Sequence, residues 1–267
     1  FDCSLSVLLC FSCVSLESHI NSTCLLRCDV ALIMSDSRTT EEARAAFQTC
    51  KSPHARDRAQ FYDMWAKNYE TDCSLMSYRA PHLAVNFLSE NFTGSPGDVL
   101  VLDVACGTGW VAKLMFELGF RHFVGVDGSK GMLDRAAETG LYQDLKLALL
   151  GTDPLPAQTG VFDVVIIVGA LCFGFIPVIV VRELCHAAKP GALVCIARGN
   201  HTGTESKEYK KDLERELQLM EDEGLWSGVG LKQADEYMQN SNLSPDRDED
   251  EQLYISGTIY LYKKSSC

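Results

Sequence analysis

One stretch near the middle of the chain, residues 99–109, constrains the fold more than any other. It reads VLVLDVACGTG, so an apolar and largely β-branched run leads into Asp103 and then into small residues and glycines. Such a run is typical of a buried parallel strand, and the following WVAKLMF is typical of a helix. Gly107 and Gly109 allow a sharp turn and a close approach of a ligand to the backbone. A strand, a glycine turn and a helix in this order predict a nucleotide-type binding edge.

Two classes of cofactor use such an edge, and Asp103 helps to separate them. Gly107-x-Gly109-x-x-Ala112 fits the fingerprint of a dinucleotide site. A pyrophosphate, however, prefers bare N–H groups and the positive end of a helix, so a carboxylate just before the glycines disfavours a nicotinamide-dependent oxidoreductase. The carboxylate suits a ligand that carries an ammonium and a sulfonium group.

The pattern Asp103-x-Ala105-x-Gly107-x-Gly109 resembles the first motif of class I S-adenosylmethionine-dependent methyltransferases. The resemblance implies an α/β fold, with a Rossmann-like, seven-stranded, mostly parallel sheet, helices on both faces and an N-terminal helical lid. It also implies S-adenosylmethionine as the methyl donor. The alternatives are a protein that binds this donor without catalysis and, less favoured, the oxidoreductase.

A second apolar run, residues 122–127, ends in another acid, Asp127. The separation of Asp103 and Asp127 suits one crossover helix between neighbouring parallel strands. A carboxylate at this position can accept both hydroxyls of a ribose, although a helix N-cap is the structural alternative. Gly128 and a serine then precede a helix over 130–138, in which Met132 can lie against an adenine ring.

The expected adenine contact departs from the family pattern. Many related methyltransferases have an aspartate just after the third strand, but that position here is Gly151, and Asp153 comes two residues later. We therefore expect the backbone of Thr152 or the side chain of Asp153 to provide the contact.

The remaining pattern alternates helices with strands. Predicted helices cover residues 41–50, 56–70, 81–91, 110–118, 177–188 and 205–223, and predicted strands cover 144–150, 160–171, 192–198, 226–237 and, antiparallel at the end, 253–262. No repeat or low-complexity linker divides residues 50–263. We expect one domain, in which residues 34–97 form the helical segment with the lid and residues 98–263 form the cofactor-binding core.

Aromatic residues at helical spacing mark the predicted helix over residues 56–70. We interpret Trp65 as a core residue and Tyr69 and Tyr78 as lid residues that cover the cofactor and exclude water. Together with Arg79 and Cys172, the two tyrosines are candidates for the pocket that faces the donor methyl group.

The segments FYDMWAKNYE (61–70), YRAP (78–81), IVGAL (167–171) and LW (225–226) resemble one methyltransferase branch, the methyltransferase-like proteins of the Williams–Beuren syndrome chromosomal region. By position, this resemblance implies that Asp103, Ala105, Gly107 and Gly109 hold the methionine end of the donor and Asp127 its ribose. It implies that Gly128 and Met132 flank the base and that Val168 and Gly169 lie beside the sulfonium. The sequence identifies neither a catalytic base nor a metal site, because a sulfonium methyl group mainly needs alignment with its acceptor.

Charge and composition bear on the partners. The formal net charge is −12, and no basic run or long apolar segment signals a nucleic-acid or membrane partner. We expect a monomer in the cytoplasm, or also in the nucleus, that acts on an unidentified small-molecule or protein acceptor.

The first 33 residues differ from the rest, with five of the 12 cysteines. Cys10-x-x-Cys13 and Cys24-x-x-x-Cys28 have zinc-like spacing, but no other feature supports a metal site. Met34 begins a polar stretch that resembles a natural start, so we predict that residues 1–33 are a dispensable, disordered or non-native extension.

Overall fold

The fold is taken from a computed structural model, which describes residues 38–52, 54–243 and 252–266. The segment 1–33, its cysteine pairs and the acidic loop 246–251 lie outside the described residues, so the predictions about them are untested. The helices are α1 (Thr40–Thr49), α2 (Ala55–Trp65), α3 (Tyr69–Leu75), α4 (Ala80–Asn91), α5 (Trp110–Glu117), α6 (Lys130–Glu138), α7 (Val180–Ala187) and α8 (Thr204–Asp222), with a short 3-10 turn at Pro96–Asp98. The strands are β1 (Leu100–Val104), β2 (His122–Asp127), β3 (Tyr142–Leu147), β4 (Phe162–Val168), β5 (Ala188–Gly199), β6 (Trp226–Gln239) and β7 (Tyr254–Lys264).

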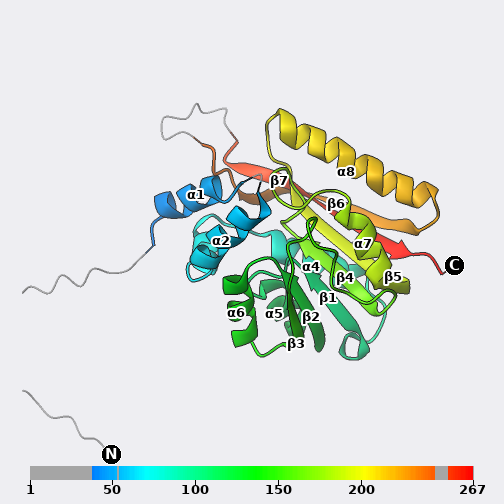
Figure 1. The fold of residues 1–267 in the computed structure, drawn as a ribbon. Coiled ribbons are helices and arrows are strands. Elements are labelled where there is room, and N and C mark those ends of the chain that lie inside the picture. The colour runs from blue at the N-terminus through cyan, green and yellow to red at the C-terminus, as the bar shows by residue number, and fades with distance from the viewer. Residues whose placement is uncertain (1–37, 53, 244–251, 267) are drawn as a thin grey trace, which may run out of the picture. The chain divides into compact units, whose positions relative to one another are not determined.

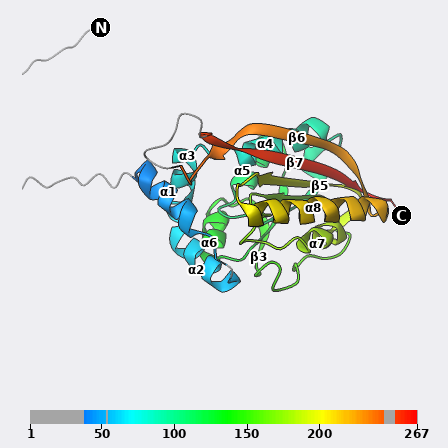
Figure 2. The same cartoon turned by 90° about the horizontal axis from the view of Figure 1, so that it is seen from above.

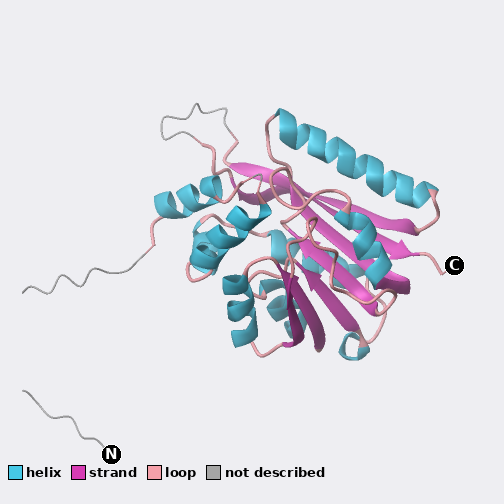
Figure 3. Ribbon diagram, viewed as in Figure 1, coloured by secondary structure: helices cyan, strands magenta, loops and turns pink. Residues whose placement is uncertain are grey.

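The strands form one sheet of seven in the order β3-β2-β1-β4-β5-β7-β6 (Figures 1 and 3). The pairs among β1 to β5 are parallel, and β7 runs antiparallel to both β5 and β6. The sequence-based prediction of a seven-stranded, mostly parallel sheet is therefore confirmed. The strand order reverses between β1 and β4, which is where open α/β sheets bind their ligands.

Helices cover both faces of the sheet because successive strand residues point to opposite sides. In β5, Val194 and Ile196 pack into the core beneath α7 and α8. Cys195 and Ala197 pack into the core beneath α4 and α5. Figure 2 shows the two helix pairs on opposite sides of the strands.

The N-terminal helices α1 and α2 lie beyond the carboxyl ends of the parallel strands (Figure 1). The predicted continuous helix over residues 56–70 is wrong, because residues 66–68 form a turn between α2 and α3. The turn lets Trp65 Nε1 donate to Asp72 Oδ2 at 2.7 Å, whereas seven residues of uninterrupted helix would separate the two by about 10 Å along the axis. Asp72 is fully buried, and its Oδ1 and Oδ2 also accept hydrogen bonds from Nε and Nη2 of Arg38, each at 2.8 Å.

Most other predicted elements agree with the structure to within a few residues. The third strand starts at Tyr142, two residues earlier than predicted. It ends at Leu147, before the predicted end, because the apolar residues Leu149 and Leu150 line a cavity instead of continuing the strand. Trp65 is 4% exposed and packs with Ala46 and Cys50, which confirms the core interpretation. No helix within the described ranges has the length and apolarity needed to cross a membrane.

Candidate functional site

A cavity with a volume of about 130 Å³ opens at the carboxyl ends of β1, β2 and β4. This edge of an open α/β sheet is where ligands bind. The predicted site residues that line it are Tyr69, Ala105, Gly107, Asp127, Gly128, Met132, Val168 and Gly169. Residues from three separate strand ends and from α3 are thus brought together.

The glycine turn after β1 presents bare backbone to this cavity. Ala105 and Gly107 both have positive φ, of 56° and 55°, and a Cβ on Gly107 would meet no atom within 4 Å. The predicted close approach of a ligand to the backbone is therefore sterically open at Gly107. Gly109 does not line the cavity. It lacks a side chain for another reason, because a Cβ there would lie 3.0 Å from Cε2 of Tyr142.

Asp127 lies at the tip of β2, and its carboxylate accepts hydrogen bonds from the backbone of two turns. Its Oδ2 accepts from Gly107 N at 2.9 Å and its Oδ1 accepts from Ser129 N at 2.9 Å. The N-cap of α6 is Ser129, whose hydroxyl accepts from Met132 N, so Asp127 is not the cap itself. Burial raises the pKa of Asp127 despite these N–H donors. Each carboxylate oxygen keeps a free lone pair for a ligand hydroxyl.

Asp103 is 1% exposed and lies at the end of β1 beneath the turn rather than in the cavity wall. Its Oδ2 accepts from the hydroxyl of Tyr142 at 2.7 Å. Burial raises the pKa of Asp103 to about 7, opposed by this hydrogen bond. Tyr142 reaches Asp103 across Gly125 of β2, where a Cβ would lie 2.8 Å from Cε1 of Tyr142. The sequence analysis missed Tyr142, because its contact depends on sheet order.

The opposite wall of the cavity comes from the N-terminal helices. Tyr69 and Tyr78, the predicted lid residues, both line it. Tyr62 of α2 and Phe175 also line it, with ring centroids 6.3 Å apart. Arg58 of α2 donates from Nη2 to the carbonyl oxygen of Phe175 at 3.0 Å, which ties the helix to the loop after β4. Aromatic spacing could have indicated Tyr62, but no sequence signal indicated Arg58.

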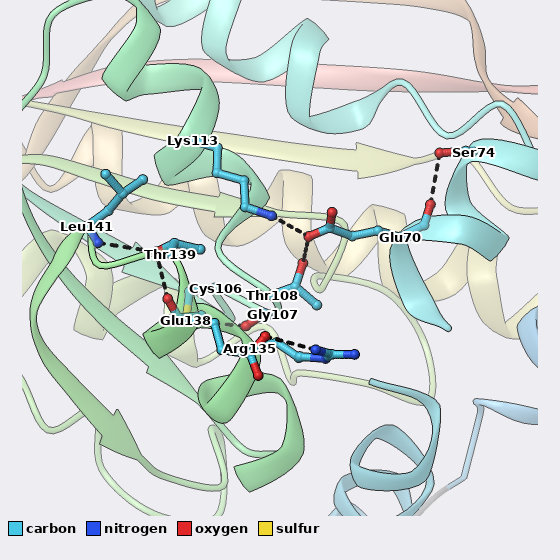
Figure 4. Close-up of polar contacts among 11 residues, drawn as sticks. Glu70, Ser74, Cys106, Gly107, Thr108, Lys113, Arg135, Glu138, Thr139 and Leu141 are labelled. Atoms are coloured by element: carbon cyan, nitrogen blue, oxygen red, sulfur yellow. Dashed lines mark hydrogen bonds and ion pairs between the residues drawn. The ribbon is translucent and has the colours of Figure 1, made fainter. Parts of the chain in front are cut away.

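A second polar contact connects α3 to the glycine turn (Figure 4). Glu70 Oε1 accepts from the hydroxyl of Thr108 at 2.6 Å and from Nζ of Lys113 at 2.7 Å. Burial acts to raise the pKa of Glu70, but the hydrogen bonds from Lys113 and Thr108 leave it lowered. Because Tyr69 directly precedes Glu70, this contact also positions a residue of the cavity wall.

Besides Asp103 and Gly109, four predicted residues do not line the cavity. Thr152 and Asp153 are exposed and do not line the cavity; Asp153 Oδ2 instead accepts from Leu149 N at 3.0 Å. Arg79 pairs with Glu236 at the surface, at 2.8 Å. Cys172 is buried without lining the cavity. The described residues include no cluster of His, Cys, Asp or Glu side chains that could hold a metal ion.

Comparison with known proteins identifies the family. Residues 101–191 match the model of a methyltransferase domain. The chain is 46% identical to human methyltransferase-like protein 27 over 177 residues, which are 66% of this chain and 71% of the relative. The chain belongs to the class I S-adenosylmethionine-dependent methyltransferases.

Solved structures agree on the fold. A chain from the complex between the Haloferax volcanii Trm112 methyltransferase activator and a methyltransferase aligns with a TM-score of 0.56 at 16% identity. The alignment covers 79% of this chain and 98% of that one. An S-adenosylmethionine-dependent methyltransferase of Thermotoga maritima aligns with a TM-score of 0.50 at 19% identity, covering 79% and 99%. At these identities the likeness concerns the fold alone.

S-adenosylmethionine is the methyl donor of this methyltransferase, and the cavity fits such a group. The open backbone at Gly107 would leave room for the amino-acid part, the carboxylate of Asp127 could accept hydrogen bonds from a ribose, and Met132, Leu149 and Leu150 would offer apolar surface to a base. The match to a methyltransferase also weighs against the oxidoreductase alternative.

Proposed function

We propose that this methyltransferase binds its donor in the cavity at the ends of β1, β2 and β4 and transfers the methyl group to a small molecule. The observation that carries the proposal is the aromatic wall of Tyr62, Tyr69, Tyr78 and Phe175 over the end of β4. An aromatic wall around a small cavity suits a small acceptor better than a long polymer. It also keeps water away from the reacting atoms.

The residue assignments follow the first-motif resemblance. Asp103, Ala105, Gly107 and Gly109 would hold the methionine end, with Asp103 acting from below the turn. Asp127 would accept the ribose hydroxyls, Gly128 and Met132 would flank the base, and Val168 and Gly169 would lie beside the sulfonium. The adenine contact by Thr152 or Asp153 remains a prediction.

The chemistry requires little beyond placement. S-adenosylmethionine supplies a methyl group that is already activated on sulfur, so alignment with the acceptor accounts for most of the acceleration. Tyr69 and Tyr78 would orient the acceptor and exclude water, and Glu70 would hold Tyr69 in position.

Calorimetric titration with S-adenosylhomocysteine tests the donor site. We expect Asp127→Asn to weaken binding at least tenfold, because a charged acceptor of hydrogen bonds is lost; tenfold corresponds to about 1.4 kcal/mol. Asp134→Asn is the matched control, since Asp134 is exposed on α6 and pairs only with Lys130 in the described residues. Equal affinities of the two variants would contradict the assignment.

Transfer from a methyl-labelled donor into a cell extract tests the acceptor class. We expect the label in the low-mass fraction. Label in protein or RNA would contradict the small-molecule proposal, and binding of S-adenosylhomocysteine without any transfer would favour a non-catalytic binding protein.

The finer placement of the chain is also a proposal. Its motifs support membership of the Williams–Beuren region branch, and the free, buried state of all six cysteines in the described residues supports a reducing compartment, cytoplasmic or nuclear. We propose a monomer, which light scattering after gel filtration would test.

A further inference from the structure

Arg198 is a buried cation that the donor site does not use. It lies near the carboxyl end of β5 and is 1% exposed. Among the described residues its buried Nε and Nη1 have no hydrogen-bond partner, and none of the salt bridges found there involves it. A buried charge without a partner is strongly unfavourable. A protein keeps such a group where an anion arrives to pair with it.

The other groups around Arg198 do not supply that anion. Its guanidinium lies over the ring of Tyr209, with Cζ 5.8 Å from the centroid. The charges of Lys51 and Arg198 both act on His201, whose pKa is lowered to about 4 by burial first and by these charges second. Lys51, Arg198 and Arg58 likewise act on Cys172. His201 is therefore neutral at pH 7. A carboxylate of the same region, Glu214, acts with Arg198 on Tyr260, but its contacts are with the hydroxyl of Tyr260 at 3.2 Å and with Nζ of Lys210 at 3.8 Å, not with Arg198.

Tyr237 connects this region to the cavity. It is 1% exposed, and its hydroxyl lies beside that of Tyr78 but makes no hydrogen bond of normal geometry within the described residues. A Cβ on Gly169, which lines the cavity, would lie 3.7 Å from that hydroxyl. A Cβ on Gly199 would lie 3.2 Å from Cε1 of the same tyrosine and 3.1 Å from Nε2 of His201. Tyr237 thus spans from the cavity wall at the end of β4 to the residue after Arg198.

We propose that the methyl acceptor is a small molecule with a carboxylate group, and that Arg198, with the hydroxyl of Tyr237 as a second donor, binds this carboxylate. The inference rests on the proposed function, because it assigns a substrate class to the acceptor. Arg198 does not itself line the cavity; it lies over Tyr209, whose hydroxyl donates to the carbonyl oxygen of Ile176 in the cavity wall at 2.6 Å. A guanidinium matches the planar geometry of a carboxylate. One buried arginine beside a neutral histidine suits a singly charged group better than a phosphate dianion. Arg198 is a binding residue here, and the atom that receives the methyl group lies elsewhere in the acceptor.

The test uses the full chain saturated with S-adenosylhomocysteine, with benzoate and acetate as probes, benzamide and acetamide as their uncharged counterparts, and methyl phosphate as the alternative anion. We expect the carboxylates to raise the melting temperature at a constant ionic strength maintained with chloride, and the amides to have no such effect. Methyl phosphate should be weaker than the carboxylates. Its superiority, or an equal effect of the amides, would overturn the proposal.

Substitutions separate a binding role from a structural one. Arg198→Met should weaken the apparent carboxylate affinity at least tenfold, and Arg198→Lys and Tyr237→Phe should weaken it severalfold. The melting temperature of Arg198→Met without ligand should equal or exceed that of the wild type, because an apolar side chain replaces an unpaired buried charge. Any fall in the melting temperature would indicate that Arg198 already has a partner in the free protein, which would overturn the proposal.

Binding of S-adenosylhomocysteine distinguishes a failure of the proposed donor site from a failure of the proposed acceptor site. S-adenosylhomocysteine should bind the wild type and Arg198→Met with equal affinity. If it binds neither, the proposed donor site fails. If it binds both while the carboxylates have no effect that depends on Arg198, only the acceptor inference fails.

Discussion

The contact of Glu70 with the glycine turn leads to a prediction that can be worked out in detail. Glu70 Oε1 accepts from Thr108 in the turn and from Lys113 in α5 (Figure 4). Glu70→Gln keeps an oxygen that can accept from Thr108 but removes the charge that pairs with Lys113. The substitution should therefore loosen α3, and with it Tyr69, from the donor site.

The magnitude follows from the exposure of the pair. A charge-assisted hydrogen bond contributes about 1.5–3 kcal/mol when buried, whereas an exposed ion pair contributes about 0–1 kcal/mol. The side chains of Lys113 and Glu70 are 40% and 43% exposed, so we expect a loss near 1 kcal/mol. If the loss falls on the bound state, the affinity for S-adenosylhomocysteine falls about fivefold.

The dependence on pH has a definite sign. The pKa of Glu70 in the folded protein is below its ordinary value of 4.5. The contribution to stability is therefore complete above pH 4.5 and is lost as the pH falls through the folded pKa. The difference in unfolding free energy between the wild type and Glu70→Gln should shrink in acid, and also in 1 M salt, where the pair is screened.

The assay combines calorimetric titration at pH 7 with thermal unfolding from pH 7 to pH 4. Glu138→Gln is the matched control, because Glu138 lines a surface pocket together with Glu70, Thr108 and Lys113, but its side chain is 64% exposed and pairs with Arg135. The control should retain the wild-type affinity. If the two variants behave alike, the contact does not position α3 and the reasoning is refuted.

Three further predictions concern the packing of Gly131 and the titration of Asp103. Gly131→Ala would bring a Cβ within 2.7 Å of the carbonyl oxygen of Asp63, so thermal unfolding should show a loss of about 1–3 kcal/mol, unlike the exposed control Lys130→Ala; unchanged stability would mean that α2 and α6 can separate freely. Because burial raises the pKa of Asp103 from 3.8 to about 7, folding takes up a proton in that range and stability should fall as the pH rises from 4 to 7; Asp103→Asn should reduce this slope, and an unaltered slope would exclude Asp103 as its source. Tyr142→Phe removes a hydrogen bond that lowers the pKa of Asp103, so the titration of Asp103, followed by carboxyl NMR, should move above pH 7.

Local patterns were sufficient where the chemistry is local. The run from Val99 to Gly109 predicted β1 and the glycine turn, the residues from Trp110 to Phe116 predicted α5, and Ser129 predicted the start of α6. Strand burial and helix capping depend on neighbours in sequence. The order and direction of the strands followed from the family resemblance as well as from alternation. The antiparallel final strand was also predicted correctly.

Long-range contacts were not accessible in this way. The spacing of Trp65 and Tyr69 continues a helical pattern across the turn between α2 and α3, and only the burial of Asp72 against Arg38 and Trp65 explains the break. Tyr142 appeared to be an ordinary residue before a strand until the sheet placed it across Gly125. Arg198 ends an apolar predicted strand, and only the structure shows that its Nε and Nη1 are buried without a hydrogen-bond partner among the described residues.

The position of β7 between β5 and β6 has a consequence for biosynthesis. Within the described sheet, β6 pairs only with β7, although it is made before it. A nascent chain that has not yet reached Tyr254 therefore presents two bare backbone edges at once, on β5 and on β6. Unpaired edges are templates for association with other chains, so premature stop codons before Tyr254 should give aggregation instead of a shorter enzyme.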